Sequence, residues 1–180
     1  MSYSTFDTLS VPIPASKATP TVNLERCLGV YFKEEMLRGA NAWFCPHCKS
    51  LQASSKRVTL ARVPRVLVIH LNRFAFGLHA ADKTDTPINF PVDELDLGPL
   101  LRRDSDSTAS GNLVQRLLAY VEHHGGLESG HYTATVRGRQ GWHTLDDEAV
   151  MQGPNDETEW RRHQASAYLL FYGAMVDTSS

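Results

Sequence analysis

The sequence is poor in the features that mark membrane proteins, secreted proteins and nucleic-acid-binding proteins. No stretch approaches the roughly 20 apolar residues of a membrane-spanning helix, and the N-terminal residues lack a basic region followed by an apolar run. Lys and Arg number 18 against 20 Asp and Glu, so no basic excess would attract a phosphate backbone or an anionic membrane. We therefore expect an intracellular protein, cytoplasmic or nuclear, that binds neither nucleic acid nor membrane.

Cysteine is scarce as well, with three residues in the chain: Cys27, Cys45 and Cys48. An odd number of cysteines, two of them in a C-x-x-C motif, does not suit the disulfide framework of a secreted protein. It is more consistent with a protein of a reducing compartment. Cys27 lies on the apolar stripe of a predicted helix, so we expect it to be buried as a small hydrophobe rather than reactive. The sequence also contains no internal repeat and no glycine-rich phosphate loop.

The 180 residues, 42% of them hydrophobic, suffice for one domain with one sizeable core. Helical spacing of apolar residues predicts an amphipathic helix that begins at Leu24 and ends near Gly39. Apolar and alternating runs predict a buried strand at 65–74 that forms a hairpin with a partner strand at 86–90. The remaining predicted elements are strands at 9–13, 113–121 and 167–172 and a short helix at 154–164. Together these elements predict an α+β fold on a mainly antiparallel sheet, with a mobile loop at 102–112 and a disordered tail at 176–180.

The segment 130–146 concentrates side chains suited to chemistry. Its pattern predicts a strand, a turn at about 138–141 and a returning strand, which places His131 and Asp146 diagonally on one face. A carboxylate there could orient the imidazole and leave the other ring nitrogen to act as a base. Asp147 would then point to the opposite face, unless a one-residue bulge reverses the register. A purely structural His–Asp pair is the alternative.

A second pattern, C-P-H-C, places Cys45 and Cys48 in a tight turn that would let two thiolates reach one metal. A tetrahedral zinc needs four ligands, and the chain has no second C-x-x-C. A pair of free thiols and an oxidisable dithiol are the alternatives. A zinc-based interaction module would rest on this motif alone.

Nine short motifs occur in a fixed order along the chain. They are L-S-V-P-I-P at 9–14, L-E-R-C-L at 24–28, C-P-H-C at 45–48, P-R-V-L-V-I-H-L-N-R-F at 64–74, N-F-P at 89–91, H-H-G at 123–125, S-G-H-Y-T-A at 129–134, W-H-T-L-D-D at 142–147 and A-Y-L-L-F-Y at 167–172. With these motifs in this order, the chain resembles the ubiquitin-specific protease family of thiol deubiquitinases (ubiquitin carboxyl-terminal hydrolases, peptidase C19) over nearly its whole length.

This resemblance implies a role for each residue of the hairpin. His131 would be the catalytic general base, Asp146 its orienting carboxylate and Asp147 a nearby auxiliary acid. A narrow channel would admit the C-terminal tail of ubiquitin, bordered by His123, Gly130 and Tyr132. The implied reaction is hydrolysis of the isopeptide or peptide bond after the last glycine of ubiquitin, through a thioester and without a cofactor for catalysis. Ubiquitin and ubiquitinated proteins would be the partners.

The resemblance also implies which parts of the family's catalytic domain are present. Residues 66–175 would form most of a papain-like palm and about 1–65 part of the fingers, with the thumb missing. Cys45 and Cys48 would be half of a four-cysteine structural zinc site. Nothing matches the family's N-terminal Cys box, so we expect the C-terminal part of a deubiquitinase that is inactive alone. The alternative is a catalytically inactive ubiquitin-binding or scaffold protein.

Overall fold

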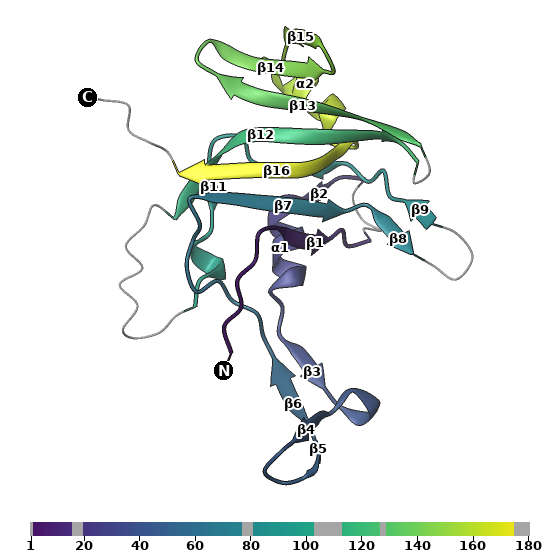
Figure 1. Cartoon of the computed structure of the whole chain (residues 1–180), viewed down its shortest axis with the longest axis vertical. Helices are drawn as coiled ribbons and strands as arrows, with labels where there is room; N and C mark the ends of the chain where they lie inside the picture. Colours follow the sequence, from purple (N-terminus) through teal and green to yellow (C-terminus); the bar gives the residue numbers. More distant parts are fainter. Residues whose placement is uncertain (1, 16–19, 77–80, 103–112, 127–128, 175–180) are drawn as a thin grey trace.

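A computed structural model describes residues 2–15, 20–76, 81–102, 113–126 and 129–174. Its centre is an eight-stranded sheet in which seven strands follow one another in the order β1-β7-β16-β12-β13-β14-β15, and β11 pairs with β12 (Figure 1). Only β1 and β7 run parallel within this sheet; its other pairs are antiparallel. The strands are β1 (Leu9–Pro12), β7 (Val66–Asn72), β11 (Leu95–Asp96), β12 (Val114–Gly125), β13 (Gly130–Gly138), β14 (Gly141–Asp146), β15 (Ala149–Gln152) and β16 (Ala167–Ala174).

Two α-helices and four two-stranded ribbons complete the described fold. The ribbons β3–β6 and β4–β5 project away from the sheet at the end of the molecule opposite to β13 and β14 (Figure 1). No described helix is long and apolar enough to cross a membrane. The elements are α1 (Leu24–Tyr31), α2 (Glu157–His163), β2 (Val22–Asn23) with β10 (Ile88–Asn89), β3 (Glu35–Leu37) with β6 (Ser54–Lys56), β4 (Trp43–Cys45) with β5 (Ser50–Gln52), β8 (Phe74–Phe76) with β9 (Ala81–Lys83), and 3₁₀ turns at Gly39–Asn41 and Gly98–Leu100. The predicted α+β fold on a mainly antiparallel sheet is confirmed.

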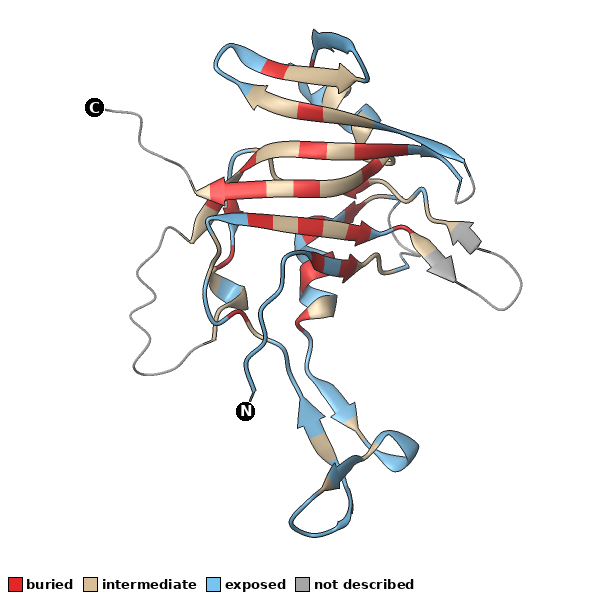
Figure 2. Ribbon diagram, in the orientation of Figure 1, coloured by how far each residue is buried: buried red, intermediate tan, exposed pale blue. Residues whose placement is uncertain are grey.

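The core lies on the central strands, and the projecting ribbons are largely exposed (Figure 2). Alternate residues of β7 are buried, as the two-residue period of a strand requires, and α1 packs on β1. Full burial of one such aliphatic side chain stabilises the fold by about 1.5–3 kcal/mol. The buried residues of these elements are Leu9, Val11, Leu24, Cys27, Leu28, Leu67, Ile69 and Leu71.

The helix α2 is anchored by aromatic packing near β12–β14. Trp160 contacts Trp142 edge-on, with ring centroids 5.1 Å apart, and lies 5.6 Å from Tyr120 by the same measure. The carboxylate of Asp156 accepts a 2.9 Å hydrogen bond from the backbone N–H of Glu159 and so caps the first turn. This packing fixes α2 against β12 and β14.

Arg73 joins three segments from inside the fold. Its fully buried guanidinium donates from Nε to the carbonyl of Ala167 at 2.6 Å and from Nη1 to those of Thr84 and Thr86 at 2.9 Å each. A fourth bond, from Nη2 to the carbonyl of Gln164, measures 2.8 Å. Burial lowers the pKa of Arg73 to about 10, so the side chain stays charged at neutral pH.

Two sequence predictions are wrong. The first helix ends at Tyr31 rather than near Gly39, because the chain enters β3 and Met36, 53% exposed, pairs across the ribbon with Ser55. The strand at 86–90 does not form a hairpin with β7: Ile88 and Asn89 pair in parallel with β2. Both edges of β7 are already occupied, by β1 and by β16. Residues 103–112 of the predicted loop and the predicted tail at 176–180 lie outside the described residues.

Candidate active site

The hairpin β13–β14 has the register that the sequence predicts, with a shorter turn. Arg137 pairs with Trp142 and Gly138 with Gly141, which leaves two residues in the turn rather than four. Gly141 has a φ of +117°, a conformation that glycine adopts without strain. Since the strands align identically in either case, the side chains that face one another are those expected.

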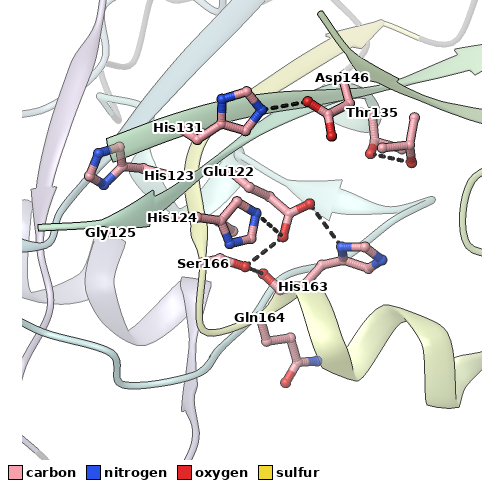
Figure 3. Close-up of polar contacts among 12 residues, drawn as sticks. Glu122, His123, His124, Gly125, His131, Thr135, Asp146, His163, Gln164 and Ser166 are labelled. Atoms are coloured by element: carbon pink, nitrogen blue, oxygen red, sulfur yellow. Dashed lines mark hydrogen bonds and ion pairs between the residues drawn. The ribbon is translucent and has the colours of Figure 1, made fainter. Parts of the chain in front are cut away.

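His131 and Asp146 meet on this hairpin. The Nε2–H of His131 donates a hydrogen bond to Oδ1 of Asp146 (Figure 3). The two side chains are 49% and 40% exposed, so solvent reaches both. The hydrogen bond and the negative charge of Asp146 raise the pKa of His131 above its usual value. Nδ1 of the imidazole, held in a fixed orientation, is left available to accept a proton from a reacting group.

Strand alternation predicts that Asp147 points away from His131, and this prediction is wrong; Asp147 lies close to His131, as the family resemblance implies. Its carboxylate and the two interacting groups of His131 and Asp146 all lie within 4.8 Å of one another. The reason is the backbone. Asp147 has a φ of +49°, in the two-residue turn that joins Asp146 to its β15 partner Ala149. The left-handed conformation changes the direction of the side chain, which simple strand alternation does not anticipate.

His123, Gly130 and Tyr132 surround the start of β13. His123 is only 4% exposed, Tyr132 is 54% exposed, and their ring centroids are 4.7 Å apart. A Cβ on Gly130 would lie 2.1 Å from Nε2 of His123, so the buried imidazole itself requires glycine there. Burial lowers the pKa of His123 and favours its neutral form. In the register His123 pairs with Tyr132 and the next residue pairs with His131, so alternation places this pair on the opposite face from His131.

Sequence reasoning missed a buried carboxylate next to the hairpin, Glu122 on β12. Its two oxygens accept a 2.9 Å hydrogen bond from Nδ1 of His163 and a 2.5 Å bond from the hydroxyl of Ser166 (Figure 3). Burial alone would raise the pKa of Glu122, but the hydrogen bonds from His163 and Ser166 outweigh it and hold the pKa below its usual value. The sequence does carry a signal for this buried carboxylate, since a glutamate directly follows the apolar run L-L-A-Y-V at 117–121.

Two groups of side chains bear on metal binding. His131, Asp146 and Asp147 form the one described group of three possible ligands, and the hydrogen bond between the first two accounts for their proximity. Cys45 ends β4 and Cys48 lies in the turn between β4 and β5, where the backbone N–H of Cys48 donates to Sγ of Cys45 at 3.5 Å. This hydrogen bond lowers the pKa of the Cys45 thiol. Such a turn fits half of a tetrahedral thiolate site for zinc.

None of the three cysteines lies at the His131 site. Cys27 is buried in α1, where burial raises the pKa of its thiol to about 11. Cys45 and Cys48 lie in the β4–β5 ribbon, at the end of the molecule opposite to β13 and β14 (Figure 1). The site therefore contains a base and carboxylates, and no described thiol is part of it.

Comparison with known proteins identifies the family. The family model described as ubiquitin carboxyl-terminal hydrolase matches residues 17–172. Human ubiquitin carboxyl-terminal hydrolase 21 is 36% identical over 176 residues, 97% of this chain and 30% of the relative. Human ubiquitin carboxyl-terminal hydrolase 15 is 34% identical over 155 residues, 85% of this chain and 15% of the relative.

A solved structure with the same fold is a chain of the SAGA Ubp8/Sgf11/Sus1/Sgf73 DUB module bound to ubiquitin aldehyde. Its TM-score is 0.74 at 29% sequence identity, over 96% of this chain and 37% of that chain. The present chain thus spans less than a third of the length of the two curated relatives. By its sequence and its fold, the chain belongs to the ubiquitin carboxyl-terminal hydrolase family, the ubiquitin-specific proteases.

Proposed function

We propose that this chain carries the general-base half of a thiol-dependent deubiquitinase that hydrolyses the bond after the C-terminal glycine of ubiquitin. The observation that carries the proposal is the hydrogen bond from Nε2–H of His131 to Asp146, on a solvent-accessible hairpin of a ubiquitin carboxyl-terminal hydrolase. In a base oriented in this way, one ring nitrogen is held by the carboxylate and the other is free to accept a proton from a reacting group.

The proposed reaction uses a cysteine supplied from outside these 180 residues. Nδ1 of His131 takes the thiol proton, and the thiolate attacks the carbonyl carbon of the scissile bond. The resulting imidazolium gives its proton to the leaving amine as the C–N bond breaks, which leaves a thioester. His131 then takes a proton from water as the water oxygen attacks the thioester carbonyl carbon. The C–S bond breaks and His131 returns the proton to sulfur, which releases the ubiquitin carboxylate and the thiol. Asp146 stabilises the imidazolium in both steps, in agreement with the raised pKa of His131, and Asp147 adds a second negative charge nearby.

The remaining predicted residues would act in binding. We assign His123, Gly130 and Tyr132 to the channel for the ubiquitin tail, since Gly130 and Tyr132 flank His131 on β13 and His123 pairs with Tyr132 from β12. Ubiquitin as a partner is supported by the ubiquitin aldehyde bound to the SAGA module. Cys45 and Cys48 would supply two of four zinc ligands in the projecting ribbons, which correspond in this proposal to the fingers.

A second candidate function is ubiquitin binding without cleavage. One observation favours it: the thiol of Cys27 is buried and the other two cysteines lie far from the hairpin. A base cannot form a thioester without a nucleophile.

The experiment that separates these functions joins this chain to the part of human ubiquitin carboxyl-terminal hydrolase 21 that precedes the matching region. Hydrolysis of a ubiquitin C-terminal amide is measured for this chimera and for His131→Ala, Asp146→Ala and Arg139→Ala variants. Arg139 is the control, because it is exposed in the turn of the same hairpin, at the end away from His131. Ubiquitin binding by the 180-residue chain and by the chimera is measured in parallel by calorimetry.

We expect hydrolysis by the chimera and a loss of about 10²–10⁴-fold on removal of the base in the His131→Ala variant. Asp146→Ala should cost less, and Arg139→Ala should leave the rate unchanged. Hydrolysis that survives His131→Ala would refute the assignment of the base. A folded chimera that binds ubiquitin but hydrolyses nothing would favour the second candidate, and absence of binding by both proteins would contradict both.

A further inference from the structure

Lys83, the last residue of β9, reaches out of its own ribbon to the end of β12. Its ammonium donates hydrogen bonds to the carbonyl oxygens of His123 at 2.8 Å and Gly125 at 2.9 Å. The carboxylate of Asp85 lies 3.8 Å away, and the lysine side chain is only 16% exposed. Lysine is seldom this enclosed, because removing an ammonium from water is costly unless acceptors replace the water. The two carbonyls and the carboxylate are those acceptors.

The two carbonyls lie where β12 has lost a sheet partner. The backbone N–H of His123 donates to the carbonyl of Ser166 at 2.9 Å, and β16 itself begins only at Ala167. In an antiparallel strand the N–H and C=O of one residue point to the same edge, and so do those of the residue two positions on. The carbonyls of His123 and Gly125 therefore face the edge beyond the start of β16. Lys83 provides there the donors that a continued strand would have provided.

This edge supports the turn into the catalytic hairpin. The turn closes with a 2.9 Å hydrogen bond from the N–H of Gly126 to the carbonyl of Ser129, and Gly130 and His131 follow at once. We propose that Lys83 is a positioning residue, which replaces the missing sheet partner at the end of β12 and holds the turn that leads to Gly130 and His131. The value of this contact for catalysis rests on the function proposed above for His131; the contact itself does not.

A first test uses the charge of Lys83 and its effect on the nearby imidazole. His123 has its pKa lowered by burial first, then by the ammonium of Lys83 and by His124. NMR titration of the 180-residue chain should show a higher pKa for His123 in Lys83→Met than in the wild type. Lys83→Gln, which keeps an NH2 donor group and loses the charge, should raise this pKa as well. Lys56→Met, a substitution of an exposed lysine on β6, should not change it.

A second test measures the turn directly by amide hydrogen exchange. Lys83→Met removes two charge-assisted hydrogen bonds, so the amides of Gly126 and His131 should exchange about tenfold faster or more, while those of β7 stay unchanged. Lys83→Gln should fall between Lys83→Met and the wild type, and Lys56→Met should match the wild type. In the chimera described above, Lys83→Met should lower kcat/KM about tenfold or more, because a displaced base loses its alignment.

The outcomes are separable. If Lys83→Met leaves the pKa of His123 and the exchange of the turn as in the wild type, the positioning role is refuted, whatever the chimera does. If Lys83→Met accelerates exchange equally throughout the sheet without raising the pKa of His123, Lys83 only supports global stability, and the proposal is refuted. If both shifts occur but the chimera hydrolyses ubiquitin equally well with and without His131, the positioning contact stands and the proposed function fails.

Discussion

Arg73 provides a stringent test of what holds together the three chain segments that it joins. Arg73→Met keeps most of the length of the side chain and removes its charge and all its donors. Four backbone carbonyls, on the two segments 84–86 and 164–167, then lose their hydrogen bonds inside the protein. Hydrogen bonds to charged groups contribute about 1.5–3 kcal/mol each, so four of them would sum to about 6–12 kcal/mol.

Part of this sum is offset, because the variant no longer buries a guanidinium and the carbonyls recover some water. We expect a net loss of about 3–5 kcal/mol in the free energy of unfolding, as found when one partner of a buried charged interaction is removed. Domains of this kind are stable by only about 5–15 kcal/mol, so the loss is a large fraction of the total.

The assay is urea-induced unfolding followed by tryptophan fluorescence, with the slope of the transition compared between variants. Arg65→Met is the matched control, because Arg65 is exposed immediately before β7, and its loss should stay within about 0.5 kcal/mol. A loss below about 1 kcal/mol for Arg73→Met, at an unchanged slope, would refute the reasoning. If Arg73→Met does not fold, Arg73→Lys gives the answer: one ammonium cannot span four carbonyls, so its stability should lie between that of the wild type and that of an unfolded chain.

Three further predictions concern the hairpin and its surroundings. Asp146→Asn removes the charge that raises the pKa of His131, so NMR titration should show a lower pKa for this imidazole; an unchanged value would contradict the observed pairing. The Glu122 pKa is lowered in the folded protein, so its carboxylate stabilises the fold above the unfolded-state pKa of about 4.3 and this contribution is lost as pH falls through the folded pKa. Glu122→Gln should therefore cost about 1–3 kcal/mol in urea unfolding at neutral pH, and this difference should shrink as the pH falls from about 4.3 through the folded pKa; a pH-independent difference would count against the charged state. Gly130→Ala brings a methyl group onto the buried ring of His123, and should cost about 1–3 kcal/mol by urea unfolding, unless His123 moves without penalty.

Local rules were sufficient for the hairpin and for the broad fold class. The register of β13 and β14 follows from strand alternation and a polar, glycine-containing turn, so the meeting of His131 and Asp146 could be predicted. The same rules failed at Asp147, because a left-handed backbone conformation changes the direction of its side chain, and the alternation of apolar and polar residues does not reveal that conformation. They also failed for the strand at 86–90, since its partner is chosen by which sheet edges remain open.

The sequence by itself determined the α+β fold, the burial of Cys27 and the placement of a histidine and an aspartate on one face of a hairpin. Each depends on residues close in the chain, where a period of 2.0 or 3.6 fixes which side chains share a face. Only the tertiary structure decided the surroundings of that pair: the buried carboxylate of Glu122, the four carbonyls around Arg73 and the reach of Lys83 to the end of β12. These contacts join segments distant in sequence, and their donors and acceptors are backbone groups or ordinary polar side chains. The periodicity of the sequence cannot predict such contacts, because they form only once the strands have packed.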